Sequence, residues 1–306
     1  MDATVAPELR RVDIGGLEIA IREWRGPLPP APSPFTERGS PNGNAPRAFV
    51  LVHGLASNAM TWDLVARRLH GQGHHVVAID QRGHGRSDMP KSGYGFDEVT
   101  GDLSRLITTM GLERPVVAGQ SWGGNVVLDF ATRYPELLSG LLLVDGGLID
   151  LSGRPGATWE QIAVNLKPPN LLGTPRPEMI ERFRNFHPAW SDEQIELQMG
   201  NYETLEDGTI RPWLTLDRHM EILQSLWDQK PSTLFERVHT PTLIAIADSG
   251  PEERRVMRAE EAHRLEASKA TVRARSFKDA VHDIHIDQPD ELTDWVLAAM
   301  SEGFFG

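Results

Sequence analysis

Short, uninterrupted runs of apolar residues recur along the chain and alternate with stretches of helical pattern. Runs of this length between helices are typical of parallel strands that are buried on both faces. They lie at residues 48–52, 75–79, 115–119, 140–144 and 242–246, and a further strand is predicted at residues 271–277. The helical stretches lie near residues 61–70, 97–110, 122–134, 252–267 and 289–300. The alternation predicts an α/β fold built on a doubly wound, mostly parallel sheet.

The N-terminal part of the chain has a different pattern. Residues 9–24 are predicted to form a β-hairpin that turns at Gly15 and Gly16, a pair that tolerates positive φ angles. Residues 27–46 are rich in Pro, Gly, Ser and Asn and poor in apolar side chains. Because such a segment cannot order itself by burial, we expect a flexible surface loop there.

The alternation stops after Leu148 and resumes at residues 242–246. Between them, residues 148–236 contain helical segments that are repeatedly broken by prolines. We interpret this segment as a helical cap inserted into a core domain formed by residues 1–147 and 237–306. The cap is rich in aromatic residues, among them Trp159, Trp190, Trp213 and Trp227. Most of these are expected to pack within the cap, and the remainder can line a pocket for a bulky apolar substrate.

A Gly-x-Ser-x-Gly motif lies between the predicted strand at residues 115–119 and the helix that follows it. Its residues are Gly119, Ser121 and Gly123. A serine at the tip of a sharp strand-to-helix turn is exposed to substrate, and small neighbours let the strand and the helix approach closely. The motif makes Ser121 a candidate nucleophile. The alternative is a glycine-rich turn that contains an ordinary serine.

A serine nucleophile needs a base to accept its proton and a carboxylate to orient that base. His282 follows the last predicted strand and precedes the last helix. Because the carboxyl ends of parallel strands meet at one edge of the sheet, a loop at this place can reach Ser121. His285, three residues further on, is the competing candidate, and we expect it to have a packing role.

With these motifs the chain resembles the α/β-hydrolases over nearly its whole length. Its His-Gly pair at residues 53–54 and its D-x-R-G-H-G-x-S stretch at residues 80–87 match motifs of that family. The family's catalytic histidine typically precedes a proline by seven residues, which matches His282 and Pro289. The resemblance also implies an oxyanion hole formed by the backbone N–H groups of Leu55 and Trp122.

Three polar residues of these motifs are expected to have structural roles instead of catalytic ones. His53 is predicted to hold its own loop by a hydrogen bond. Asp80 and His84 are predicted to fix the loop after the fourth strand of the family's sheet.

The triad acid departs from the commonest pattern of the family. After the strand at residues 242–246, glycine occupies the usual carboxylate position, at Gly250, and Asp248 is displaced from it by two residues. In a minority of members the acid instead follows the sixth strand, about two dozen residues after the nucleophile. Asp145 lies 24 residues after Ser121, at the end of such a strand. This spacing favours Asp145 and leaves Asp248 as the alternative.

Composition excludes several other functions. The 306 residues include 31 Lys and Arg against 43 Asp and Glu, a net charge of −12 that opposes binding to nucleic acid or to anionic membranes. The chain contains no cysteine, so it has no disulfide and no cysteine nucleophile. It lacks an N-terminal signal pattern and a long apolar stretch, so we expect a soluble, cytoplasmic protein. Whether it forms a homodimer stays open.

No cofactor is expected, because the sequence has no dinucleotide fingerprint, phosphate loop or cluster of metal-ligand spacing. The His and Asp residues at 282–287 lack the partner cluster that a metal site requires.

The sequence therefore predicts a metal-independent serine hydrolase that cleaves an ester or a lactone. A hydrolase of carbon–carbon bonds in aromatic ring-fission products would use the same triad and is the enzymatic alternative. A receptor on the same fold with negligible turnover is the non-enzymatic one. Haloalkane dehalogenases and epoxide hydrolases are disfavoured, because their nucleophile position holds aspartate where this chain has Ser121.

Overall fold

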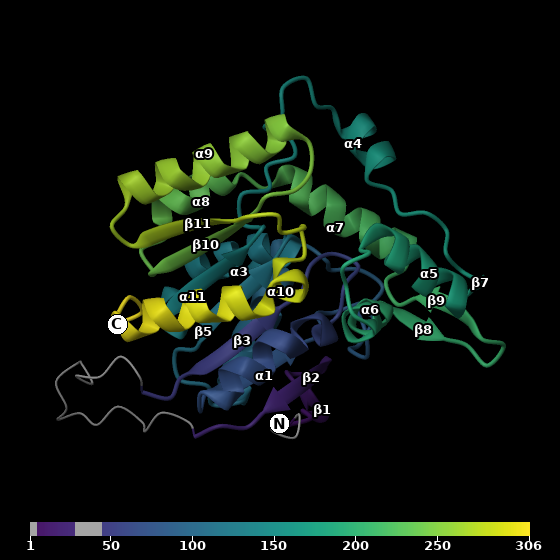
Figure 1. The fold of residues 1–306 in the computed structure, drawn as a ribbon, viewed down its shortest axis with the longest axis horizontal. Coiled ribbons are helices and arrows are strands. Elements are labelled where there is room, and N and C mark those ends of the chain that lie inside the picture. Colours follow the sequence, from purple (N-terminus) through teal and green to yellow (C-terminus); the bar gives the residue numbers. More distant parts are fainter. Residues whose placement is uncertain (1–4, 28–44) are drawn as a thin grey trace.

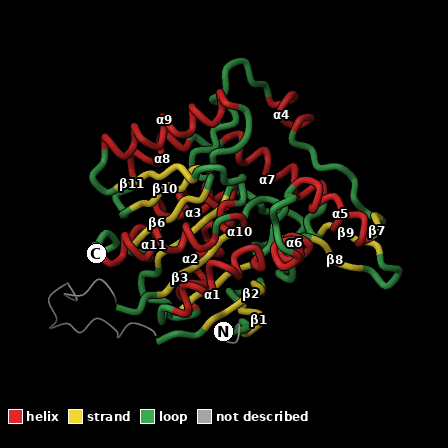
Figure 2. Tube along the Cα trace, in the orientation of Figure 1, coloured by secondary structure: helices red, strands yellow, loops and turns green. Residues whose placement is uncertain are grey.

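The computed structural model describes residues 5–27 and 45–306, and it is organised around one twisted sheet of eight strands (Figures 1 and 2). The strand order is β1-β2-β4-β3-β5-β6-β10-β11. Strands β1 and β2 are antiparallel to their neighbours, and the other pairs are parallel. The strands are β1 (Glu8–Asp13), β2 (Glu18–Trp24), β3 (Ala48–Val52), β4 (His75–Ile79), β5 (Val116–Gln120), β6 (Gly140–Val144), β10 (Thr242–Ala247) and β11 (Val272–Phe277).

Helices cover both faces of this sheet, so β3 to β6 are buried on both sides. Apolar residues of one face pack against α1 (Asp63–Gly71), α10 (Ile284–Asp287) and α11 (Pro289–Ser301). Those of the other face pack against α2 (Phe96–Thr109), α3 (Trp122–Arg133), α8 (Pro231–Arg237) and α9 (Glu252–Ser268). The predicted doubly wound α/β sheet is confirmed. The prediction succeeds because a strand formed by a continuous apolar run leaves no face for solvent.

The predicted N-terminal hairpin is present as β1 and β2, and its turn contains Gly15 and Gly16 at φ angles of 97° and 89°. Both values lie in the left-handed region that favours glycine. The expected flexible loop at residues 27–46 lies almost entirely outside the described residues.

The segment between β6 and β10 contains helices and, in addition, a small sheet that the sequence analysis did not predict. Its helices are α4 (Trp159–Asn165), α5 (Arg176–Phe186), α6 (Asp192–Met199), α7 (Leu216–Asp228) and α8. The small sheet has the strand order β7 (Thr174–Pro175), β9 (Thr209–Pro212) and β8 (Tyr202–Thr204). Most of this segment lies beside the main sheet in Figure 1, with α4 at the upper right and the strands β7, β8 and β9 at the far right. Phe235 of α8 instead packs in the main core, and the division into core and cap at residue 236 stays a prediction.

Two helices of the inserted segment are tied to the core by polar contacts. On α7, Glu221 Oε1 accepts hydrogen bonds from the N–H groups of Gly93 and Tyr94, both at 2.8 Å. On α6, Gln194 Nε2 donates to the carbonyl oxygen of Ile286 at 2.6 Å. These contacts hold the segment over the edge of the sheet at which β5 and β6 end.

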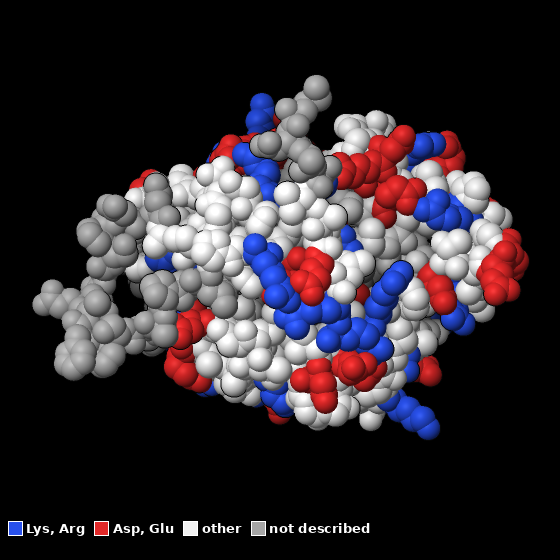
Figure 3. All heavy atoms as spheres, turned by 90° about the horizontal axis from the view of Figure 1, so that it is seen from below, with Lys and Arg blue, Asp and Glu red and all other residues white. Residues whose placement is uncertain are grey.

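The surface mixes both signs of charge. Figure 3 shows basic and acidic side chains interspersed on the face seen from below, without a large area of one sign. Among the helices of residues 5–27 and 45–306, none has the length and apolar character needed to cross a membrane.

Candidate active site

Ser121 lies at the turn from β5 into α3, in a strained backbone conformation with φ 53° and ψ −123°. Its N–H donates to the carbonyl oxygen of Val144 at 3.0 Å, which fastens the turn to the end of β6. The neighbouring glycines leave the space that this conformation needs. A Cβ atom at Gly119 would lie 2.2 Å from the carbonyl oxygen of Gly123, and one at Gly146 would lie 2.2 Å from that of Ser121. The strain and the close packing are those of a turn that presents a nucleophile.

Asp145 and His282 form a direct hydrogen bond across 137 positions of the chain. The distance from His282 Nδ1 to Asp145 Oδ2 is 2.6 Å, and the Asp145 side chain is only 1% exposed. The second carboxylate oxygen, Oδ1, accepts a hydrogen bond from the N–H of Ala247 at 3.1 Å. A carboxylate held at Nδ1 favours the tautomer that leaves Nε2 free to accept a proton.

The surroundings of His282 favour a moderately basic imidazole. Burial lowers the pKa of His282, but the hydrogen bond to Asp145 and the negative charges of Asp283 and Asp145 outweigh it, so the pKa lies above its ordinary value. The positive charge of Arg258 acts in the opposite direction. The ring is 47% exposed, so solvent reaches it even though protein atoms surround it closely.

Asp248 has different partners. Its Oδ1 pairs with Arg255 Nη1 at 2.8 Å, and its Oδ2 accepts a hydrogen bond from the N–H of Asp279 at 3.4 Å. Within the part of the chain that the structure describes, no hydrogen bond joins Asp248 to His282. The geometry therefore brings only one of the two candidate acids into contact with the imidazole.

The loop with His282 is linked to the serine turn through Gln120, the residue before Ser121. Gln120 Nε2 donates to Asp283 Oδ1 at 3.1 Å and to the carbonyl oxygen of His282 at 3.4 Å. No hydrogen bond between Ser121 Oγ and the His282 ring is found among the described residues. In the absence of substrate, such catalytic hydrogen bonds are often long, and they tighten when the substrate binds.

The loop after β3 lies directly beside the serine. A Cβ atom at Gly54 would lie 3.1 Å from Ser121 Cβ. Leu55 is the residue after Gly54, so its backbone lies close to the nucleophile. Within the described residues the N–H of Leu55 has no acceptor. Trp122 is the first residue of α3, a position whose N–H has no partner within a helix. Neither of the N–H groups predicted for an oxyanion hole thus has an acceptor among the described residues, and the oxyanion hole stays a prediction.

His53 and His84 have the contacts of residues that hold loops. His53 Nδ1 lies 2.7 Å from the carbonyl oxygen of Gly54, and its Nε2 accepts from the N–H of Gln81 at 3.0 Å. His84 Nε2 accepts from the N–H of Ala56 at 3.2 Å. Burial lowers the pKa of both histidines, so they stay neutral and can accept these bonds.

Asp80 also holds a loop, because its Oδ1 accepts a hydrogen bond from the N–H of Ala59 at 2.8 Å, and its Oδ2 accepts one from that of Arg86 at 2.9 Å.

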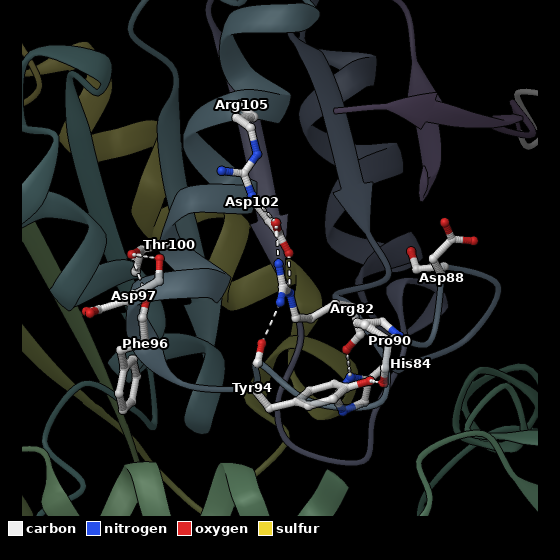
Figure 4. A network of polar contacts seen from close by, with 12 residues as sticks. Arg82, His84, Asp88, Pro90, Tyr94, Phe96, Asp97, Thr100, Asp102 and Arg105 are labelled. Carbon is white, nitrogen blue, oxygen red and sulfur yellow. Dashed lines mark hydrogen bonds and ion pairs between the residues drawn. The ribbon is translucent and has the colours of Figure 1, made fainter. Parts of the chain in front are cut away.

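The loop that contains His84 is fixed by a buried ion pair that the sequence analysis did not identify (Figure 4). Arg82 Nε and Nη2 donate to the two carboxylate oxygens of Asp102 on α2, at 2.5 and 2.7 Å. Tyr94 closes the same loop, since its hydroxyl donates to the carbonyl oxygen of Pro90 at 2.7 Å. Arg82 was visible as a motif residue, but nothing in the helical pattern of α2 marks Asp102 as its partner.

Apolar side chains from the core and the inserted segment meet above this arrangement. Trp122, beside the serine, shares a cluster with Ile222 and Leu223 of α7. Partly buried residues pack against that cluster, namely Leu55, Ile149, Trp159, Met220 and Trp227. A separate groove of about 780 Å³ runs between residues 85–89 and β8, and neither Ser121 nor His282 is among its lining residues. The apolar cluster, and not this groove, adjoins the candidate nucleophile.

Five of the arginines of the inserted segment have hydrogen-bond partners that bear on substrate binding. Four of them pair with carboxylates: Arg176 with Glu196, Arg182 with Glu178, Arg184 with Asp192, and Arg211 with Glu203. Arg218 donates to the carbonyl oxygens of Met89 and Pro90 at 2.9 and 3.1 Å. Four of the five are therefore neutralised by carboxylates, whereas Arg218 is bound by neutral carbonyl oxygens and keeps its charge.

Comparison with known proteins places this geometry in a family. The model of the alpha/beta hydrolase family matches residues 49–295. The chain is 30% identical over 137 residues to 2-(acetamidomethylene)succinate hydrolase of Mesorhizobium japonicum, covering 44% of this chain and 42% of that protein. It is 34% identical over 113 residues to epoxide hydrolase B of Mycobacterium tuberculosis, covering 35% of this chain and 32% of that protein. The chain matches less than half the length of either relative.

Solved structures agree with the family match. The crystal structure of E-2-(acetamidomethylene)succinate hydrolase superimposes with a TM-score of 0.72 at 21% sequence identity, covering 95% of this chain and 98% of that one. At this identity the likeness shows the fold alone. Together with the family match, it confirms the α/β-hydrolase fold that the motifs predict.

Proposed function

This chain belongs to the alpha/beta hydrolase family, and on that premise we propose that it is a serine hydrolase acting on an ester or lactone of a bulky apolar substrate. The hydrogen bond of 2.6 Å between His282 and the buried Asp145 is the main support for the proposal. The strained backbone of Ser121 adds support for a Ser-His-Asp triad.

In this mechanism Ser121 Oγ attacks the substrate carbonyl carbon while His282 Nε2 takes the hydroxyl proton. The N–H groups of Leu55 and Trp122 donate to the oxyanion that forms, and they stabilise it more than the ground-state carbonyl. The imidazolium then gives its proton to the leaving alkoxide, which departs and leaves Ser121 acylated. Water attacks the acyl-enzyme with His282 again acting as base, and the acid and free Ser121 are released.

Several observations favour a neutral, apolar substrate. Leu55, Ile149 and Trp159 pack against the apolar cluster that contains Trp122, the residue after Ser121, and apolar surroundings with few polar groups suit an apolar ligand. Four arginines of the inserted segment are already paired with carboxylates. A carbon–carbon hydrolase acting on a dienoate would need a cation for the substrate carboxylate, so this second candidate has less support.

Serine at the nucleophile position also separates this chain from the epoxide hydrolases it partly matches. In that group the position holds aspartate, which forms an ester with the opened epoxide. Ser121 cannot form that intermediate, so we expect no epoxide hydrolysis.

Substrate size provides a direct test. We expect kcat/KM for a bulky aromatic ester or aromatic lactone to exceed that for an acetate ester with a similar leaving group. The physical reason is that an apolar pocket gains about 25 cal/mol for each Å² of apolar surface that it removes from water. Initial rates over a panel of both kinds measure it. A clear preference for acetate esters would contradict the proposal, and failure of every ester to show multiple turnover would favour the receptor alternative.

The identity of the triad acid provides a second test. We expect Asp145→Asn to lower kcat by up to about ten-thousandfold, because the amide favours the wrong histidine tautomer and no longer stabilises the imidazolium. The matched variant Asp248→Asn should keep most of the activity, since Asp248 contacts Arg255 and Asp279 instead of His282. Both are compared by kcat in folded protein. A crippled Asp248→Asn beside an active Asp145→Asn would assign the acid to the end of β10.

A further inference from the structure

The carboxylate that contacts His282 has a second charged partner, which no sequence motif indicates. Asp145 Oδ2 accepts from His282 Nδ1 at 2.6 Å and also from Arg258 Nη1 at 2.8 Å. Arg258 lies on α9, 113 positions away from Asp145. Its side chain is 30% exposed, whereas that of Asp145 is 1% exposed. One oxygen atom therefore lies between a permanent cation and the imidazole.

Arg258 is itself held in place by the turn between β10 and α9. Its Nη2 donates to the carbonyl oxygens of Ser249 and Ala247, at 2.8 and 3.4 Å. The N–H of the same Ala247 donates to Asp145 Oδ1. The guanidinium thus joins the end of β10 to the carboxylate, and every contact uses the planar, multi-donor geometry that arginine offers and lysine does not.

The turn after β10 has no carboxylate at the usual position of the triad acid. Gly250 occupies the position at which the motif comparison expects an acid, and the same turn binds Arg258, which contacts the acid that follows β6. A carboxylate with donors on both oxygens has a fixed orientation, and a neighbouring guanidinium favours its ionised form.

The charges around His282 oppose one another. Asp145 lies at Nδ1, Asp283 follows in the chain, and Arg258 lies beyond the Asp145 carboxylate. The two carboxylates favour the imidazolium, and the guanidinium disfavours it. His285 on α10 is the other titratable group that interacts with the ring, and burial lowers the pKa of His285 to about 3, so it adds no positive charge near neutral pH.

We propose that Arg258 is a positioning residue that fixes the Asp145 carboxylate and keeps His282 unprotonated, and therefore usable as a base, at lower pH than the two carboxylates alone would allow. This inference rests on the proposed function, because it takes His282 as the base. According to this inference, the ion pair between Arg258 and Asp145 sets the lowest pH at which the enzyme is active.

The test is the pH dependence of kcat/KM in Arg258→Gln. Without the cation the imidazole binds a proton more tightly, so the acid limb of the pH profile should move to higher pH. The expected increase in the proton affinity of His282 is roughly 3- to 10-fold, because Arg258 is partly exposed and lies beyond the Asp145 carboxylate. Arg258→Lys should restore part of the shift. Arg255→Gln, on the same helix but paired with Asp248, should leave the limb unchanged. Asp283→Asn should move the limb in the opposite direction, to lower pH.

A titration of the His282 ring by NMR separates this inference from the proposed function. The His282 resonances are identified by their loss in His282→Asn, and their pKa is measured in wild-type and Arg258→Gln protein whether or not a substrate is known. A higher pKa in folded Arg258→Gln supports the inference even if no ester is hydrolysed. An unchanged pKa and an unchanged acid limb would overturn it, and a shift of equal size in Arg255→Gln would reduce it to a general charge effect.

Discussion

Replacing Ser121 by Ala should lower kcat for ester hydrolysis on the order of a millionfold, which is the loss commonly found when a triad nucleophile is removed. The hydroxyl is the only group of this residue that can form the acyl-enzyme. Alanine retains the Cβ atom, so the backbone strain at φ 53° is the same in both proteins and the variant should fold as wild type does.

The measurement is kcat in folded Ser121→Ala, with Ser301→Ala as the control. Ser301 is an exposed serine at the end of α11, where its hydroxyl only caps the carbonyl oxygen of Ala298. The control should retain full activity. A fluorophosphonate should label the wild type and Ser301→Ala, and it should not label Ser121→Ala. More than a few per cent of residual turnover in folded Ser121→Ala would refute the assignment of the nucleophile.

The sheet and its helices were predictable because their signals are local. The apolar runs at residues 48–52 and 140–144 coincide with β3 and β6, since a strand buried on both faces consists mostly of apolar residues. The turn at Ser121 was equally accessible, because the Gly-x-Ser-x-Gly motif is a continuous stretch of sequence and Gly119 is required by its contact with Gly123 four residues away. Local sequence thus indicated both the fold and the position of the candidate nucleophile.

The small sheet of the inserted segment was not predicted, for a physical reason. Strands β7, β8 and β9 have two to four residues each, and β7 and β9 each end in a proline. A pattern of alternating polar and apolar positions cannot be recognised over so few residues, and proline is more often a sign of a loop. These strands form through pairing with one another, which no single one of them reveals.

Partners that are distant in the chain were also beyond the reach of the sequence. Arg258 lies in a charge-rich stretch of α9 that resembles an ordinary solvated helix face. Asp102 on α2 likewise has the pattern of a charged residue on a solvated helix face. Each becomes informative only when the fold places it against Asp145 or Arg82. The choice between Asp145 and Asp248 also depends on a distant contact. Spacing favoured Asp145 but left Asp248 open as the triad acid, and the hydrogen bond between Asp145 and His282 distinguishes the two.

Replacing His282 by Ala should be about as damaging as the loss of Ser121, on the order of a millionfold in kcat, because members of a triad act as a unit. The matched variant is His285→Ala, three residues further along the chain, on α10. His285 is fully buried, its ring centroid lies 4.5 Å from that of Trp62, and both its ring nitrogens lack a hydrogen-bond partner among the described residues. It therefore packs in the core and has no polar contact to lose.

We expect less than about a tenfold loss of kcat in folded His285→Ala, because a base must reach the serine proton and this ring does not. The cavity left by the substitution can lower stability, so His285→Phe is the second variant, which keeps a ring against Trp62. Both are assayed at a temperature at which near-ultraviolet circular dichroism shows native packing. If folded His285 variants lost as much activity as His282→Ala, the buried ring would have to act on the reacting atoms, and the assignment of His282 as sole base would be wrong.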